Sequence, residues 1–239
     1  MVTPTPQTPI AAVVVAAGSG SRFGGDLPKQ FLPLAGKPVV CHCLDTLRTV
    51  FPQLDVVLVL SDSGKEIWEE LCARTGYSSP EVVLGGATRS ESVLNGLRTL
   101  RRRGVPGNAV VLVHDGARPF PAPDLLRSLV EALEGGAGAA APAVALTDSV
   151  LAFGDGLGVE VVPRDSLRAV QTPQAFRLDE IIHAHANHDN AKHGAPTDEC
   201  AAYIHAFGRP VTLVAGSPDN IKITNPRDLA IAEIICAAI

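Results

Sequence analysis

Apolar and polar positions follow one another along this chain in blocks. Short runs of β-branched and other apolar residues, such as IAAVVVA at 10–16 and DVVLVL at 55–60, are followed by longer segments with helical spacing. Strands that read as continuous apolar runs are typical of a sheet covered on both faces, and strands that alternate with helices favour parallel pairing. Further strands are predicted at 81–84, 109–114, 138–146, 211–215 and 220–223. Helices are predicted at 38–50, 64–75, 88–103, 123–134, 178–187, 197–207 and from 225 onward.

Two of the predicted helices begin with a recognisable cap. Thr88 and Glu91 have the spacing of a capping box. Asn225 is a preferred N-cap residue, and Pro226 follows it at the first helical position. These starts support the helical assignment of both segments.

One segment departs from the alternation of strands and helices. Residues 149–153 and 157–162 flank Gly154-Asp155-Gly156, which is a hairpin signal. The stretch that follows, up to Pro173, is polar with few apolar anchors. We expect about 147–176 to leave the core as an arm. The predicted fold is α/β, a three-layer Rossmann-like, mostly parallel sheet with helices on both faces and a protruding β-arm. It forms a single domain over 10–239, after a flexible tail at 1–9.

Composition narrows the class of function. The chain has 239 residues, which suits one domain. Its 20 basic and 25 acidic residues give a net charge of -5, unlike a protein that coats nucleic acid. No apolar run reaches the roughly 18 residues of a membrane span, and the N-terminus lacks the basic and apolar regions of a signal peptide. The five cysteines form no C-x-x-C pair, which favours reduced thiols in the cytoplasm. We therefore expect neither a nucleic-acid nor a membrane partner.

The first predicted strand leads into a glycine-rich loop, AAGSGSRFG at 16–24. Backbone N–H groups of such a loop can approach an anion closely, because glycine has no Cβ. A P-loop would need Lys-Ser or Lys-Thr after its second glycine, and a dinucleotide fingerprint would need a third glycine where this chain has Phe23. A long loop that wraps a nucleoside triphosphate, with Arg22 and Lys29 as nearby cations, fits better. An NAD-dependent oxidoreductase is the alternative from another class.

Six motifs, in this order, resemble those of the 2-C-methyl-D-erythritol 4-phosphate cytidylyltransferase family, over about residues 10–237. They are AAGSGSR with PKQ at 16–30, GGATRSESV at 85–93, HDGARP at 114–119, QTPQAF at 171–176, TDE at 197–199 and DNIKIT at 219–224. The resemblance implies Mg²⁺-dependent transfer of CMP from CTP to 2-C-methyl-D-erythritol 4-phosphate, in non-mevalonate isoprenoid biosynthesis, by a homodimer. Transfer to D-ribitol 5-phosphate is a sibling activity that the sequence leaves open, as is a CTP-binding regulator without activity.

The resemblance also assigns residues to roles. The attacking phosphate is already anionic, so the reaction needs cations that hold two anions together rather than a general base. The implied catalytic cations are Arg22, Lys29 and Lys222. The implied nucleotide-binding residues are Ala16, Ala17, Gly18, Gly20, Gly86, Ala87, Ser92 and Asp115. The implied acceptor-binding residues are Asp115, Arg118, Ser149, Arg164, Thr172 and Thr197. Through the arm, Ser149 and Arg164 would enter the neighbour's site. Mg²⁺ would be held mainly by the CTP phosphates, and no side chain is assigned to it.

Four histidines cluster at 183, 185, 188 and 193. Their spacing includes an i, i+3 pair, but asparagine and aspartate surround it. We interpret the segment as a solvated helix end rather than a zinc site.

Overall fold

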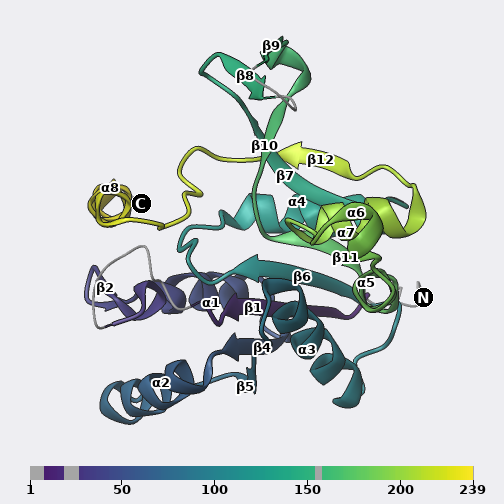
Figure 1. The fold of residues 1–239 in the computed structure, drawn as a ribbon. Coiled ribbons are helices and arrows are strands. Elements are labelled where there is room, and N and C mark those ends of the chain that lie inside the picture. Colours follow the sequence, from purple (N-terminus) through teal and green to yellow (C-terminus); the bar gives the residue numbers. More distant parts are fainter. Residues whose placement is uncertain (1–7, 19–26, 154–157, 239) are drawn as a thin grey trace, which may run out of the picture.

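The computed structural model describes residues 8–18, 27–153 and 158–238. Most of the tail predicted at 1–9 therefore lies outside the described residues. Within these ranges, eight strands form one central sheet in the order β10-β7-β11-β6-β1-β4-β5, with β12 paired to β7 (Figure 1). The strands are β1 (Ile10–Ala16), β4 (Asp55–Leu60), β5 (Glu81–Leu84), β6 (Val110–Asp115), β7 (Ala139–Ala145), β10 (Arg168–Val170), β11 (Gln174–Arg177) and β12 (Thr212–Ala215).

The sheet is mostly parallel, as predicted. Strands β6, β1, β4 and β5 run parallel, and β12 runs parallel to β7, whereas β10 and β11 are antiparallel to their neighbours. In this register Val15 of β1 lies opposite Asp115 of β6 on one side and Val59 of β4 on the other. The carboxyl ends of these strands therefore meet at one edge, where the loops that follow them converge.

Helices cover both faces of the sheet, and each face has its own core. The helices are α1 (Val39–Val50), α2 (Asp62–Thr75), α3 (Arg89–Arg102), α4 (Pro123–Glu134), α5 (Leu178–Ala186), α6 (Asn190–His193), α7 (Glu199–Phe207) and α8 (Pro226–Ala238). Ala12 and Val14 of β1 belong to the core under α1, α2 and α4, whereas Ala11 and Val13 belong to the core under α3, α5 and α7. Because both faces are buried, the strand is apolar at successive positions rather than alternate ones.

Both predicted N-caps are present, but the reciprocal bond of the capping box at α3 differs, because the Glu91 carboxylate accepts from the Ala87 N–H. The Thr88 hydroxyl accepts from the Glu91 N–H at the start of α3. At α8 the Asn225 side chain accepts from the Asp228 N–H, and the Asp228 carboxylate accepts from the Asn225 N–H. These reciprocal bonds satisfy donors that a helix start otherwise leaves unpaired.

The predicted hairpin forms and projects from the rest of the molecule (Figure 1). Strand β8 (Val150–Phe153) pairs with β9 (Val159–Val162). The last part of the expected arm, however, belongs to the main sheet, because β10 and β11 pair with β7 and β6 and Phe176 is fully buried. Only a few apolar side chains anchor this stretch, which is why its pattern reads as polar.

The prediction of a strand at 220–223 is wrong. The segment joins no sheet, and its backbone contacts are made instead to the loop after β6. The Ile223 N–H donates to the Ala117 carbonyl, and the Arg118 side chain donates to the Asn220 carbonyl. Isolated bonds of this kind fix an extended segment without forming a ladder. Short elements not predicted also occur, including a 3₁₀ turn at Lys29–Phe31, a second at Arg164–Ser166, and the small hairpin of β2 (Pro33–Leu34) with β3 (Lys37–Pro38).

Candidate active site

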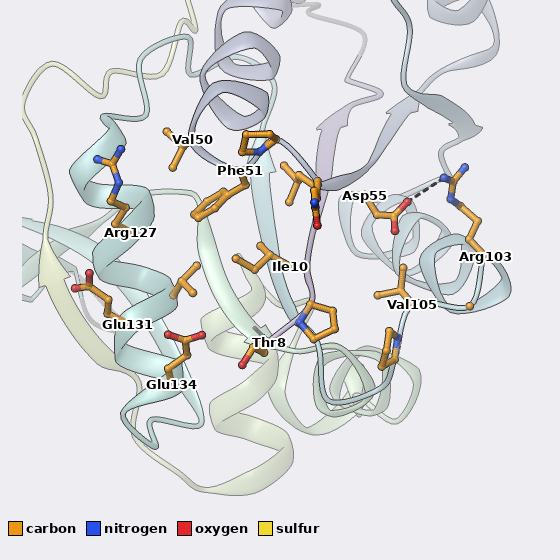
Figure 2. Close-up of a pocket in the computed structure, with 17 residues that line it drawn as sticks. Thr8, Ile10, Val50, Phe51, Asp55, Arg103, Val105, Arg127, Glu131 and Glu134 are labelled. Carbon is orange, nitrogen blue, oxygen red and sulfur yellow. Dashed lines mark hydrogen bonds and ion pairs between the residues drawn. The ribbon is translucent and has the colours of Figure 1, made fainter. Parts of the chain in front are cut away.

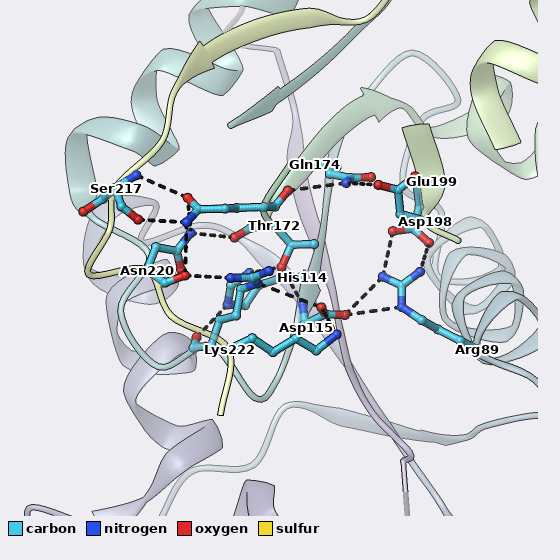
Figure 3. Close-up of polar contacts among 12 residues, drawn as sticks. Arg89, His114, Asp115, Thr172, Gln174, Asp198, Glu199, Ser217, Asn220 and Lys222 are labelled. Atoms are coloured by element: carbon cyan, nitrogen blue, oxygen red, sulfur yellow. Dashed lines mark hydrogen bonds and ion pairs between the residues drawn. The ribbon is translucent and has the colours of Figure 1, made fainter. Parts of the chain in front are cut away.

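Asp115, the last residue of β6, is the centre of a charged cluster at the carboxyl edge of the sheet (Figure 3). Lys222 Nζ lies 2.7 Å from Asp115 Oδ2, and Arg89 Nη2 lies 3.1 Å from Asp115 Oδ1. Burial alone would raise the pKa of the Asp115 carboxyl, but Arg89 and Lys222 hold that pKa well below its usual range. The carboxylate is therefore ionised at neutral pH and keeps a cation on each oxygen.

Arg89 reaches a second carboxylate on its other side. Arg89 Nη1 and Nη2 donate to the two oxygens of Glu199 at 2.7 and 3.0 Å, a bidentate contact. Glu199 is fully buried at the start of α7, where the preceding Asp198 is the N-cap. Burial raises the pKa of Glu199, and the Arg89 guanidinium opposes that shift. One arginine thus joins the start of α3, the end of β6 and the start of α7.

A buried histidine supports the backbone around Asp115. Burial lowers the pKa of His114 to about 4, so its ring is neutral at physiological pH. His114 Nε2 lies 2.9 Å from the Arg118 carbonyl and must donate to it, which leaves Nδ1 to accept from the Thr172 hydroxyl at 3.2 Å. The Thr172 oxygen in turn accepts from the Asp115 N–H at 3.0 Å. This chain fixes Thr172 and Asp115 relative to each other.

Arg118 lies at the same edge with an unused donor. Its Nη1 donates to the Asn220 carbonyl at 2.7 Å, and Asn220 donates from Nδ2 to the Thr172 carbonyl at 2.9 Å. Its Nε is buried and has no hydrogen-bond partner among the described residues, and it lies 4.0 Å from Asp115 Oδ2. A buried guanidinium nitrogen without an acceptor indicates a place for an anionic ligand.

The loops after β1 and β5 meet beside this cluster. Gln30, which is buried, donates to the carbonyls of Ala16 and Gly18 at 2.7 and 3.2 Å and so holds the start of the glycine-rich loop. A Cβ on Gly85 would lie 2.7 Å from both the Ala17 Cβ and the Ser92 hydroxyl, so glycine is needed for the two loops to approach this closely. The Ser92 hydroxyl accepts from the Gly86 N–H and donates to the Thr88 carbonyl.

The remaining residues predicted for the site are distributed more widely. Gly20 and Arg22 lie outside the described residues. Lys29 lies in the 3₁₀ turn after the loop. Thr197 is exposed two positions before Glu199. Ser149 and Arg164 are exposed on the arm, where Arg164 Nη1 donates to the Thr147 carbonyl.

Sequence reasoning did not assign Gln30, Arg89 or Glu199 to the site, although each lies inside a motif that carried the resemblance. It also misplaced His185. This side chain is buried, and its Nδ1 lies 2.7 Å from the Ser90 hydroxyl, so the interpretation as part of a solvated helix end is wrong at this position. The residues around it in sequence are polar, but α5 turns this histidine toward α3. Burial lowers the pKa of His185 to about 4.

A cavity of about 780 Å³ opens at the other edge of the sheet, where β1 and β4 begin. Its lining includes Ile10, Phe51 and Val105 (Figure 2). The charged side chains at its rim are exposed, and Arg103 is paired with Asp55 at 2.9 Å. None of the predicted site residues that the structure describes lines this cavity.

The described part of the chain contains no three histidine, cysteine, aspartate or glutamate side chains placed to hold a metal ion. It also contains no helix long and apolar enough to cross a membrane. The five cysteines are unpaired, and each is at least partly buried.

An open α/β sheet that has the start of a glycine-rich loop and a charged cluster at its carboxyl edge fits the class of α/β nucleotidyltransferases, and the family comparison assigns the chain to that class. The chain belongs to the 2-C-methyl-D-erythritol 4-phosphate cytidylyltransferase family, whose profile matches residues 10–238. This membership confirms the resemblance and the transferase class, and it removes the oxidoreductase alternative.

Relatives and solved structures agree with this assignment. The 2-C-methyl-D-erythritol 4-phosphate cytidylyltransferase of Pelotomaculum thermopropionicum is 42% identical over 233 residues, which are 96% of this chain and 94% of the relative. That of Porphyromonas gingivalis is 40% identical and covers 94% and 96%. The crystal structure of 4-diphosphocytidyl-2C-methyl-D-erythritol synthase from Anaerococcus prevotii superposes with a TM-score of 0.79 at 29% identity, over 96% of both chains.

Proposed function

We propose that this chain transfers CMP from CTP to 2-C-methyl-D-erythritol 4-phosphate, giving 4-diphosphocytidyl-2-C-methyl-D-erythritol and pyrophosphate in non-mevalonate isoprenoid biosynthesis. The observation that carries the proposal is the cluster of Asp115, Lys222 and Arg118 at the carboxyl edge of the sheet. Its two cations, Lys222 and Arg118, lie at the edge where two phosphate-bearing substrates must approach each other, and the buried Arg118 Nε has no hydrogen-bond partner among the described residues.

The reaction needs charge stabilisation more than proton transfer. An oxygen of the acceptor phosphate, whose second pKa is about 6, attacks the α-phosphorus of CTP. As that P–O bond forms, the bond from the α-phosphorus to the bridging oxygen breaks and pyrophosphate leaves with the electron pair. Arg22, Lys29 and Lys222 are proposed to neutralise the charge that gathers on the phosphoryl oxygens. Asp115 holds Lys222 in place through an ion pair of 2.7 Å.

The acceptor phosphate would be bound beside the β6 loop. Arg118 offers its unpaired Nε there, and Thr172 lies on the same hydrogen-bonded chain. Thr197 would contact the polyol. Ser149 and Arg164 project on the arm, from which they would enter the site of a second copy.

The nucleotide would lie between the loops after β1 and β5. Ala16, Ala17, Gly18 and Gly20 would follow the triphosphate with their backbone, while residues 85–87 would face the base. The N–H groups of Gly86 and Ala87 are already bound by Ser92 and Glu91, so base recognition falls to carbonyl oxygens of this segment. Carbonyl oxygens accept from the amino group of cytosine and repel the O4 of uracil, which favours CTP over UTP.

Mg²⁺ fits this site as a companion of CTP. Both oxygens of Asp115 already accept from cationic side chains, so the triphosphate oxygens and water would supply most of its ligands. When bound, Mg²⁺ would neutralise charge on the triphosphate. We assign no side chain to it.

A homodimer formed through the arm is part of the proposal. Leu151, Phe153, Val159 and Val161 are at least half exposed on the hairpin, which is costly for an isolated chain and indicates a covered surface. A second copy of the chain would cover this surface and would receive Arg164 in its own acceptor site. The unpaired cysteines support a cytoplasmic location.

Pyrophosphate release tests the function directly. The purified protein would be assayed with CTP and Mg²⁺, in parallel with 2-C-methyl-D-erythritol 4-phosphate and D-ribitol 5-phosphate, and with UTP and EDTA as controls. Release with the first acceptor alone is expected. Release with ribitol phosphate alone would keep the chemistry and replace the acceptor. No release with either, while CTP still binds by calorimetry, would favour a regulator.

A further inference from the structure

Arg89 lies between the nucleotide-binding part and the acceptor-binding part of the proposed site. It begins α3 directly after the segment 85–88 that would face the base, and its partner Glu199 begins α7 two positions after Thr197. Between them lies Asp115, which both Arg89 and Lys222 contact. Figure 3 shows the guanidinium of Arg89 between the carboxylates of Glu199 and Asp115.

The hydrogen bonds of Arg89 are committed to protein groups. Nε and Nη2 donate to Asp115 Oδ1 at 3.3 and 3.1 Å, while Nη1 and Nη2 donate to Glu199. Oδ1 of Asp115 is therefore engaged by Arg89, and Oδ2 is the oxygen that Lys222 contacts at 2.7 Å. The rotation of the Asp115 carboxylate, and with it the position of the Lys222 ammonium, depends on where Arg89 lies.

Glu199 is what keeps Arg89 there. Its side chain is fully buried, whereas the Arg89 side chain is 31% exposed. A buried carboxylate is stable as an anion only with its partner, so the pair is held in one geometry. The planar guanidinium matches both carboxylates at once, which a lysine ammonium on a flexible stem does not do.

We propose that Arg89 and Glu199 are a positioning pair for cytidylyl transfer, in which Glu199 anchors Arg89 and Arg89 orients Asp115 so that Lys222 is held at the reacting phosphates. This inference rests on the proposed function. Neither residue touches the reacting atoms. Because Lys222 acts on charge that develops in the transition state, a loosened Lys222 lowers kcat more than it weakens CTP binding.

The test compares Arg89→Lys, Arg89→Met and Glu199→Gln with a matched control. Arg103 also lies between two carboxylates, Asp55 and Glu81, but at the opposite edge of the sheet, so Arg103→Lys is that control. Each variant would be assayed for kcat and KM by pyrophosphate release, for CTP affinity by calorimetry and for unfolding midpoint in urea.

The Arg89→Lys enzyme is expected to lose about 10–100-fold in kcat, because small displacements of catalytic groups cost this much. Its CTP affinity should stay near wild type. The control, Arg103→Lys, should keep the wild-type kcat. Arg89→Lys should also regain unfolding stability relative to Arg89→Met without regaining kcat. A merely structural role predicts that kcat recovers with stability. If Arg89→Met does not fold, Glu199→Gln supplies the test, because it keeps the side-chain size and is also expected to lower kcat.

The outcomes separate the inference from the function on which it rests. A wild-type enzyme that releases no pyrophosphate with any acceptor overturns both. An active wild type together with Arg89→Lys and Glu199→Gln variants at wild-type kcat overturns the positioning pair alone.

Discussion

The two edges of the central sheet each hold an arginine between two carboxylates, and they differ in what surrounds it. At the carboxyl edge Arg89 bridges Asp115 and Glu199, whose side chains are 10% and 0% exposed. At the amino edge Arg103 bridges Asp55 and Glu81, whose side chains are 45% and 48% exposed. The contacts are of similar length, so the difference is one of dielectric environment. In water such a pair contributes little, whereas a buried one determines geometry.

The amino edge of the sheet holds a cavity, whereas the carboxyl edge holds the candidate active site. The cavity of about 780 Å³ lies at the amino edge, and its polar groups are exposed at the rim. The carboxyl edge instead gathers loops from β1, β5 and β6, because parallel strands all end there. In this molecule the convergent polar groups of the family motifs lie at the carboxyl edge and not around the cavity, so they mark the site.

The largest expected effect comes from Lys222. Lys222→Ala removes a cation proposed to act on the reacting phosphates, and we expect kcat to fall by about 10³-fold, or about 4 kcal/mol of transition-state stabilisation. The urea midpoint is expected to fall less than in Arg89→Met, because Asp115 keeps its ion pair with Arg89 after this substitution. Lys65→Ala, which breaks an exposed pair with Glu69, is the matched control. Wild-type kcat in the Lys222→Ala enzyme would refute the catalytic role.

Removing each bridging arginine tests the comparison of the two edges directly. Arg89→Met leaves the buried Glu199 unpaired and is expected to cost about 3 kcal/mol of unfolding free energy. Arg103→Met breaks exposed pairs and is expected to cost less than about 1 kcal/mol. Urea unfolding at pH 7 measures both. Equal losses would mean that burial does not distinguish the two arginines.

The buried His185 makes the free energy of unfolding depend on pH. The pKa of His185 is lowered to about 4 in the folded chain, so between pH 6.5 and pH 4 the unfolded chain binds a proton that the folded chain excludes. Stability is therefore lost as pH falls, by about 2 kcal/mol for this group between pH 7 and pH 5. His185→Asn should flatten the pH dependence of the unfolding free energy by this amount. His183→Asn, at an exposed position of the same helix, is the control, and an unchanged slope in His185→Asn would contradict the assignment.

The smallest expected effect concerns the arm. Arg164→Ala removes a charged donor proposed to reach the acceptor phosphate of a second copy, and we expect KM for the acceptor to rise about tenfold. KM for CTP and the urea midpoint should stay unchanged, because Arg164 is exposed. Arg168→Ala, whose side chain bonds only backbone carbonyls among the described residues, is the control. Equal increases in both KM values would place Arg164 outside the acceptor subsite.

Local patterns predicted most helices and strands because both faces of this sheet are covered. The apolar run at β1 and the cap at Thr88 are short-range features, and the structure reproduces them. The prediction failed for β10 and β11, where few apolar residues mark strands that pair antiparallel with distant partners. It failed in the opposite sense at 220–223, where an extended segment contacts a loop instead of a strand.

The sequence by itself determined the α/β class, the glycine-rich loop and the family, since these depend on residue types at short spacing. Tertiary structure alone decided that Arg89 and Glu199, 110 positions apart, would share a bidentate contact, and that Lys222 would meet Asp115 across 107 positions. It also decided that His185, in a polar stretch, would be buried. Burial and charge pairing depend on which elements pack together, and that packing follows from the sheet order, which spacing along the chain does not encode.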